Sequence, residues 1–150
     1  MARASGDQTT TSALDALGTP PWKNPRNYGI LRRATRVYEA KTTDPAPESW
    51  WVRSPDYDTP EIRDSHLEGE DFSYLQFVGL QGEGMFSRVD LPGLGSEFQV
   101  PVFIAQGAED LVTVPDVAKR FFDGISTPEK RFVLVPRAGH DPNRPMLDAV

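Results

Sequence analysis

The sequence predicts an α/β fold, and three segments near its C-terminal end carry that prediction. Residues 100–105 form a short β-branched apolar run that ends at Gly107, and residues 131–135 form a second apolar run. Runs of this length are typical of strands that are buried on both faces, as in a parallel sheet. Between them, residues 115–125 repeat apolar side chains at helical spacing. A strand, a helix and a strand in this order predict one parallel crossover unit.

A helical and loop-rich region precedes this unit. Residues 12–18 predict a short helix that ends at a glycine, and Pro25 opens a longer helix with one apolar stripe. Thr59, followed by Pro and Glu, has the pattern of a further helix start, and residues 72–77 predict another short helix. Glycines are frequent in residues 79–96, which we therefore interpret as a linker.

Composition narrows the functional classes. The chain of 150 residues has a formal net charge of −6 and no cluster of Lys and Arg, which argues against a nucleic-acid-binding surface. It has no cysteine, so disulfides and thiolate metal sites are excluded, and its two histidines cannot form a three-imidazole metal site. No segment approaches the ~20 apolar residues that span a bilayer, and residues 1–11 lack the apolar core of a signal peptide. We therefore expect a cytoplasmic protein without nucleic-acid or membrane partners.

Polar side chains follow both predicted strands at the point where each strand ends. Glu109 and Asp110 come shortly after the first strand, and His140 follows the second. The carboxyl ends of neighbouring parallel strands meet at one edge of a sheet, which is where sites form in open α/β folds. We therefore expect an acid and a histidine to lie close together. A carboxylate that holds an imidazole in one tautomer is the supporting half of a nucleophilic triad.

These residues resemble the C-terminal part of the α/β-hydrolase fold family. The resemblance is carried by four matches: Val-Pro-Val-Phe-Ile-Ala-Gln-Gly-Ala-Glu-Asp over residues 100–110, Pro115 at a helix start, Phe-Val-Leu-Val-Pro over residues 132–136, and Gly139-His140. In that family the chain order is nucleophile, acid, histidine. The resemblance implies Asp110 as the acid and His140 as the general base. Glu109 is the rival for the acid, but the family places the acid third after Gly107.

The region ahead of the strands resembles the helical cap that this family inserts before its last two core strands. The resemblance implies an incomplete α/β-hydrolase fold, in which residues 1–90 form a helical cap or lid and residues 91–150 the C-terminal part of the core. Two shorter stretches, Phe-Phe-Asp-Gly-Ile at 121–125 and His-Asp-Pro at 140–142, most resemble the prolyl-iminopeptidase-like branch.

The chain departs from the family at the nucleophile. The family carries its serine in a Gly-x-Ser-x-Gly turn between a strand and a helix. Here Ser96 follows Gly95, but Leu94 and Phe98 occupy the outer positions where that motif has glycines. We therefore interpret the chain as the C-terminal part of a longer hydrolase whose N-terminal half, with the serine and the early strands, is missing from this sequence.

The resemblance implies serine-dependent hydrolysis of an ester or amide bond in a small molecule or a peptide, and its narrower form implies removal of an N-terminal residue from a peptide. It implies no metal and no organic cofactor. The chain by itself is expected to be inactive, because an acid and a histidine without a nucleophile cannot form an acyl-enzyme. The alternative is a non-catalytic, truncated relative that binds a partner or a ligand.

Other side chains allow a functional and a structural interpretation. Trp50 and Trp51 are candidates for lining a substrate pocket, and packing within the cap is an equal alternative. His66 lies among acidic residues, where metal binding is conceivable, but a solvated helix face is favoured. Three acids are weighed as contacts for a substrate amino group against ordinary surface charge, which is favoured for each: Glu39, Glu48 and Glu61. Three arginines are interpreted as a solvated helix face: Arg32, Arg33 and Arg36.

Overall fold

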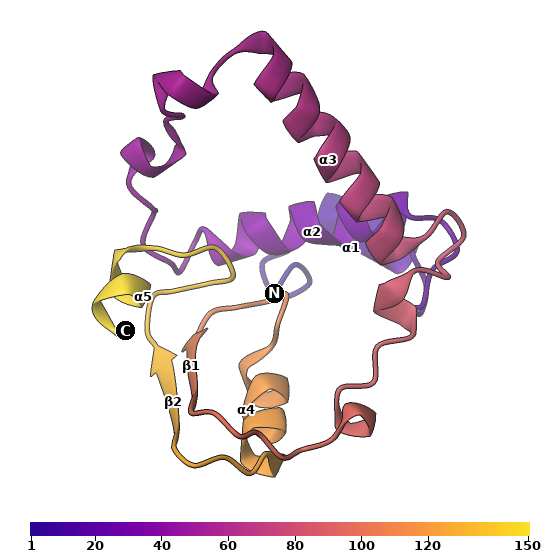
Figure 1. Cartoon of the computed structure of the whole chain (residues 1–150). Helices are drawn as coiled ribbons and strands as arrows, with labels where there is room; N and C mark the ends of the chain where they lie inside the picture. Colours follow the sequence, from indigo (N-terminus) through magenta and orange to yellow (C-terminus); the bar gives the residue numbers. More distant parts are fainter. The chain divides into compact units, whose positions relative to one another are not determined.

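The computed structural model describes residues 1–150 and has a mixed helical and sheet architecture (Figure 1). The helices are α1 (Gln8–Asp15), α2 (Arg26–Glu39), α3 (Pro60–Val78), α4 (Pro115–Gly124) and α5 (Arg144–Asp148), and the strands are β1 (Val102–Gly107) and β2 (Lys130–Val135). Four short 3₁₀ helices lie between them, namely η1 (Glu48–Trp51), η2 (Pro55–Tyr57), η3 (Met85–Ser87) and η4 (Pro92–Leu94). The coarse prediction of an α/β fold is confirmed.

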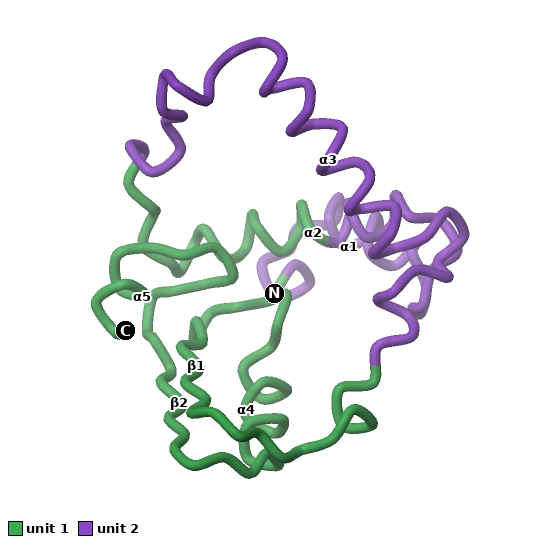
Figure 2. The backbone as a smooth tube through the Cα atoms, viewed as in Figure 1, with its two compact units in different colours: residues 1, 32–47, 90–150 green, residues 2–31, 48–89 purple.

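The chain divides into two compact units (Figure 2). Unit 1 contains residues 1, 32–47 and 90–150, and unit 2 contains residues 2–31 and 48–89. The second half of α2 and the loop after it therefore group with the strands. The assignment of residues 1–90 as a cap concerns function and stays a prediction.

The sheet of unit 1 consists of β1 and β2 in parallel register, from Val102 opposite Lys130 to Gly107 opposite Val135. The predicted order of strand, helix and strand is confirmed, because α4 connects the two strands and contacts both. β1 begins two residues later than predicted. Pro101 has no N–H to donate, whereas the Val102 N–H donates to the Glu129 carbonyl at 2.9 Å and starts the ladder.

The expectation that both strands are buried on both faces is wrong for this structure. α4 packs against the sheet through Phe122, whose ring centroid lies 5.3 Å from that of Phe132. Phe103 of β1 remains 60% exposed, however, and Leu134 of β2 remains 52% exposed. The physical reason is that the main helical cover of the sheet comes from α4, which contacts both strands, and from α5, which contacts β1. Two short helices do not cover both faces of a sheet.

The helical predictions were wrong in two details. α3 is one helix of 19 residues rather than two, and it begins where the Thr59 side chain accepts a hydrogen bond from the Ile62 N–H. Gly69 lies inside α3, where a glycine costs only about 1 kcal/mol relative to alanine. α1 begins four residues before the predicted start at residue 12, because the Asp7 side chain caps it by accepting from the Thr10 N–H at 3.0 Å.

Unit 2 is held together by an aromatic cluster. The ring centroids of Trp22 and Tyr28 lie 4.9 Å apart in an edge-to-face pair, Tyr28 meets Phe86 edge-to-face at 5.5 Å, and Phe77 lies tilted against Phe86 at 5.2 Å. The Tyr74 hydroxyl also donates to the Pro25 carbonyl at 2.6 Å. Edge-to-face pairs of this kind add to the stabilisation from apolar burial. Across the whole chain, no helix combines the length and the apolar character needed to cross a membrane.

A close backbone approach at the end of β1 yields the first testable prediction. A Cβ atom at Gly107 would lie 2.3 Å from the Gly139 carbonyl oxygen and 2.5 Å from that of Ala138, which is fully buried. Backbone atoms cannot move away as a flexible side chain would, so we expect Gly107→Ala to lower the free energy of unfolding by about 1–3 kcal/mol. Urea unfolding followed by circular dichroism, with hydrogen exchange of the β1 and β2 amides, measures this change.

Gly124→Ala is the matched control for this substitution. A Cβ atom at Gly124 meets nothing within 4 Å, so we expect this variant to be neutral or more stable by at most about 1 kcal/mol, the helix-propensity difference. Equal unfolding midpoints for the two variants would contradict the proposed close packing.

Candidate active site

Two loops of unit 1 meet at the carboxyl edge of the sheet. The loop after β1 begins beside the loop after β2, because Gly107 and Val135 are partners at the end of the ladder. Backbone bonds continue this pairing beyond the strands, since the Ala108 N–H donates to the Val135 carbonyl and the Glu109 N–H donates to the Ala138 carbonyl. Residues separated by 30 positions in the sequence are thereby brought together.

The structure brings together the two residues that the sequence singled out. Asp110 in the first loop lies 3.2 Å from the Nδ1 atom of His140 in the second loop, measured from its Oδ2 atom. Asp110 is only 4% exposed, whereas the His140 side chain is 35% exposed. A buried acid thus supports an imidazole that solvent can reach. The catalytic roles of both residues stay predictions.

The Asp110 carboxylate is surrounded by hydrogen-bond donors. Its Oδ1 atom accepts from the N–H groups of Val112 and Thr113, both at 2.8 Å. Its Oδ2 atom accepts from the Thr113 hydroxyl at 2.5 Å and from Gln106 Nε2 at 3.1 Å, in addition to His140. Burial by itself raises the pKa of Asp110, but the bonds from Thr113, Val112 and His140 outweigh it and lower the pKa below its ordinary value. Asp110 is therefore an anion at neutral pH.

This network determines the tautomer of His140. An ionised carboxylate can only accept hydrogen bonds, so the Nδ1 atom of His140 must carry the hydrogen that it shares with Asp110. The hydrogen bonds described for His140 all involve Nδ1. The lone pair of the neutral ring is then on Nε2, which is the arrangement that a general base requires.

Sequence analysis missed two members of the network. Thr113 carries a recognisable signal, because an acid followed three residues later by Thr is typical of a turn in which the carboxylate accepts local N–H groups. Gln106 carries no such signal, since its contact with Asp110 depends on how β1 is oriented. The rival acid Glu109 makes no contact with His140, and its described hydrogen bond runs from its backbone N–H to Ala138.

The second loop is tied to Asp44 of unit 1. The Asp44 N–H donates to the Arg137 carbonyl, and the Arg137 guanidinium binds the Asp44 carboxylate. The hydrogen bond from Arg137 lowers the pKa of that carboxyl below its usual range. Asn143 is only 2% exposed and donates from Nδ2 to the carbonyls of both Asp44 and Arg137. These contacts hold the loop that carries His140.

Two interpretations of side chains on α2 are wrong. Glu39 is not a solvated surface charge, because it is only 5% exposed and its Oε1 atom accepts from the Leu111 N–H at 2.7 Å. Arg32 is not part of a solvated face, because its Nη2 atom donates to Asp141 at 2.9 Å. Both partners lie in the loops that carry the candidate acid and histidine.

The two predicted substrate-binding tryptophans belong to unit 2. Trp50 and Trp51 end η1 and line a hollow of about 470 Å³, together with Tyr57, Ile62 and His66 among others. Trp51 remains 64% exposed. The side chain of His66 contacts Glu70 at 3.2 Å on the solvent side of α3. A substrate-binding role for the two tryptophans stays a prediction.

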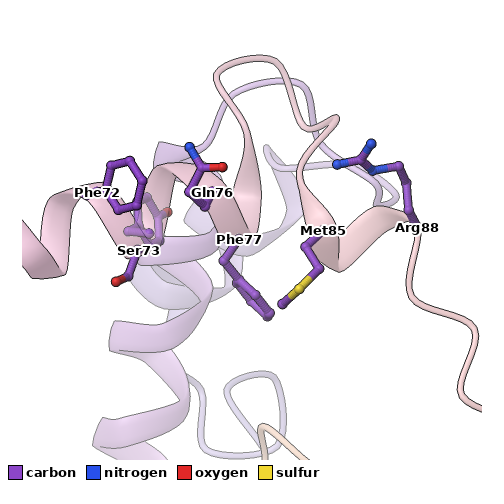
Figure 3. Close-up of a pocket in the computed structure, with 7 residues that line it drawn as sticks. Phe72, Ser73, Gln76, Phe77, Met85 and Arg88 are labelled. Atoms are coloured by element: carbon purple, nitrogen blue, oxygen red, sulfur yellow. The ribbon is translucent and has the colours of Figure 1, made fainter.

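A second hollow of unit 2, of about 640 Å³, lies between the end of α3 and η3 (Figure 3). Figure 3 shows the side chains of Phe77 and Met85 pointing toward one another. Arg88 is the one charged residue among its lining side chains. This hollow contains none of the residues that the sequence predicted for a site.

The pair at the sheet edge can accept a proton but provides no nucleophile. The Thr113 hydroxyl is the nearest candidate, but it lies on the Nδ1 side of His140 and donates to Asp110. It is therefore not placed to lose its proton to Nε2. Comparison of the chain with protein-family models, with curated proteins and with solved structures found no match. The function must therefore be inferred from the residues at the sheet edge.

The hydrogen bonds to Asp110 predict an acid-dependent loss of stability. A carboxyl whose pKa is lowered in the folded state contributes stability above its unfolded pKa, and this contribution is lost as the pH falls through the folded pKa. For Asp110 the loss begins near the ordinary value of 3.8 and continues below it. We expect Asp110→Asn to be less stable than the wild type at neutral pH and to lose less stability below pH 3.8.

This prediction is measured by urea unfolding of both proteins across the acid range. The difference between their free energies of unfolding at each pH gives the contribution of Asp110, because the other carboxyls are present in both. Asp116→Asn is the matched control, because Asp116 lies in the exposed first turn of α4 and has no described contact with the site. If Asp110→Asn and the wild type lost stability in parallel as the pH falls, the ionic network would be wrong.

Proposed function

We propose that this chain contributes the acid and the histidine of a serine-dependent α/β hydrolase that cleaves an ester or amide bond. The observation that carries the proposal is the hydrogen bond between Asp110 and His140 at the carboxyl edge of a parallel sheet. An ionised, buried acid and an accessible imidazole are the supporting half of a nucleophilic triad. The resemblance of residues 100–143 to the last part of that fold supports the same assignment.

In this scheme His140 Nε2 accepts the proton of a serine hydroxyl while the serine oxygen attacks the substrate carbonyl. The same nitrogen then returns the proton to the leaving group. Asp110 keeps the hydrogen on Nδ1 and stabilises the imidazolium that forms between these two steps. Gln106 and Thr113 orient Asp110, because each donates a hydrogen bond to its Oδ2 atom, and the bonds from Thr113 also lower its pKa and keep it ionised.

The serine comes from polypeptide outside this chain, which we propose to be the N-terminal half of the same hydrolase core. That half also supplies the further strands of the sheet. This accounts for the exposed Phe103 and Leu134 on the two-stranded sheet, since strands of parallel sheets are ordinarily covered on both faces. The resemblance to the prolyl-iminopeptidase-like branch extends the proposal to removal of an N-terminal residue from a peptide, with no metal or cofactor required.

A binding role for unit 2 is the second candidate function. It is favoured by the aromatic side chains that stay exposed around the hollow at Trp50 and Trp51, including Tyr57 at 67%. Exposed apolar patches on a folded chain often mark interaction sites. In this alternative the chain binds a partner or ligand through unit 2, and Asp110 and His140 have no catalytic role.

A fluorophosphonate probe distinguishes the two functions because it labels only an activated serine. We expect no labelling of the 150-residue chain, and stoichiometric labelling of one serine when the chain is produced together with the upstream coding sequence. In that longer protein, His140→Ala is expected to lower the rate of labelling and of activated-ester turnover by at least about 10³-fold, as loss of a triad member does. Labelling of a serine within the 150-residue chain would contradict the proposal that the nucleophile comes from outside this chain.

His66→Ala is the matched control, because His66 is the other histidine of the chain and lies in unit 2. The His66→Ala variant should be labelled by the probe, and should turn over the activated ester, at the wild-type rate. A longer protein in which His140→Ala retains near-normal turnover would favour the binding role. If Asp110→Asn were harmless and Glu109→Gln were not, the choice of acid alone would be wrong.

A further inference from the structure

The second half of α2 presents charged side chains to both loops of the candidate site. Arg32, Arg36 and Glu39 are spaced four and three residues apart, which places them on one face of the helix. All three belong to unit 1, with the strands and both loops. Each contacts a residue next to Asp110 or His140 in the sequence, but neither of those two residues themselves.

Glu39 contacts the neighbours of both candidate catalytic residues. Its Oε1 atom accepts a hydrogen bond from the Leu111 N–H at 2.7 Å, and Leu111 directly follows Asp110. Its Cδ atom lies 3.4 Å from the position that a Cβ atom would occupy at Gly139, which directly precedes His140. The buried carboxylate therefore fills the space between the two loops and bonds to one of them.

Arg32 extends this contact to the far side of His140. Its Nη2 atom donates to Asp141 Oδ1 at 2.9 Å, and its Nη1 atom lies 3.7 Å from Glu39 Oε2. Arg36 adds a longer contact of 3.4 Å to the other oxygen of Asp141. Arg32 Nη1 is buried and has no hydrogen-bond partner, so the guanidinium charge is balanced by the ion pairs with Asp141 and Glu39. Removing one member of such a pair leaves the other charge uncompensated.

A continuous bridge therefore runs from Leu111 through Glu39 and Arg32 to Asp141. It joins the residue after the acid to the residue after the histidine. On the inner side, the same two loops are joined by the bond between Asp110 and His140 and by the longer contact of the Thr113 hydroxyl with His140 Nδ1. Each end of the bridge is attached to one loop, so the bridge supports the separation of the two loops together with the backbone bond from the Glu109 N–H to the Ala138 carbonyl.

We infer that Glu39, acting with Arg32, is a positioning residue that holds Asp110 and His140 at hydrogen-bond distance. The inference rests on the function proposed above, since a positioned imidazole matters only if His140 transfers protons. It assigns Glu39 no contact with a substrate. It also distinguishes Glu39 from the Asp44–Arg137 pair, which holds the histidine loop but has no described contact with Leu111.

The tautomer of His140 can be measured by ¹⁵N NMR in the 150-residue chain. In alkaline buffer, where the imidazole is neutral, this method distinguishes the Nδ1–H from the Nε2–H tautomer. The chain has only two histidines, so His66 in unit 2 is an internal reference in the same spectrum. We expect His140 to be in the Nδ1–H form in the wild type because it donates to Asp110.

Glu39→Ala is expected to lower the ratio of Nδ1–H to Nε2–H tautomer at His140 by about tenfold, as expected for loss of one hydrogen bond to a charged group. Glu39→Gln keeps an acceptor for the Leu111 N–H and should retain more of the Nδ1–H form than Glu39→Ala does. Arg33→Ala is the matched control, because Arg33 lies on the exposed part of the same helix without a described ion pair. It should leave the ratio unchanged.

Arg32→Ala carries the test if Glu39→Ala does not fold, because the Arg32 side chain is 28% exposed whereas that of Glu39 is 7% exposed. It should shift the His140 ratio in the same direction while His66 stays unchanged. Wild-type tautomer ratios in both Arg32→Ala and Glu39→Gln, or in a folded Glu39→Ala, would overturn the inference. These outcomes need no serine, so the labelling experiment would still decide the proposed function separately.

Discussion

Parallel pairing of β1 with β2 is the constraint on which the candidate site depends. The register ends with Gly107 opposite Val135, so the loops that follow the two strands begin side by side. The glycine is required there because Ala138 and Gly139 approach its backbone too closely for a side chain. Beyond this close approach, Asp110 and His140 lie at hydrogen-bond distance. The site is thus a consequence of strand pairing rather than of either loop alone.

Two buried carboxylates complete the arrangement in different ways. Asp110 is surrounded by side-chain and backbone donors and stays ionised in spite of its burial. Glu39 accepts one backbone N–H and faces a buried arginine nitrogen. Buried charges persist in proteins only where they are hydrogen-bonded or paired. Both acids meet that requirement at the junction of the two loops, which is where a proton-transfer site needs its residues held in place.

The distribution of apolar side chains agrees with a chain that functions together with further polypeptide. Phe103 and Leu134 on the sheet, and Trp51 and Tyr57 in unit 2, are all more than half exposed. A two-stranded parallel sheet with two short helices leaves strand edges and parts of its faces open. In the proposed hydrolase, the half that carries the nucleophile would supply the missing neighbours of the two strands, so that Phe103 and Leu134 would become part of its core.

The sequence by itself determined the order of strand, helix and strand, because apolar runs and helical periodicity are local signals that predict a parallel crossover unit. It also determined the proximity of Asp110 to His140, because each residue follows the end of one strand and both ends lie at the same edge of a parallel sheet. It also contained the signal for Thr113, through its spacing from Asp110. Only the tertiary structure decided that Glu39 and Arg32 are buried beside the two loops and that Gln106 reaches Asp110. A glutamate or an arginine on a helix looks solvated in the sequence, and its burial depends on which distant loops pack against that face.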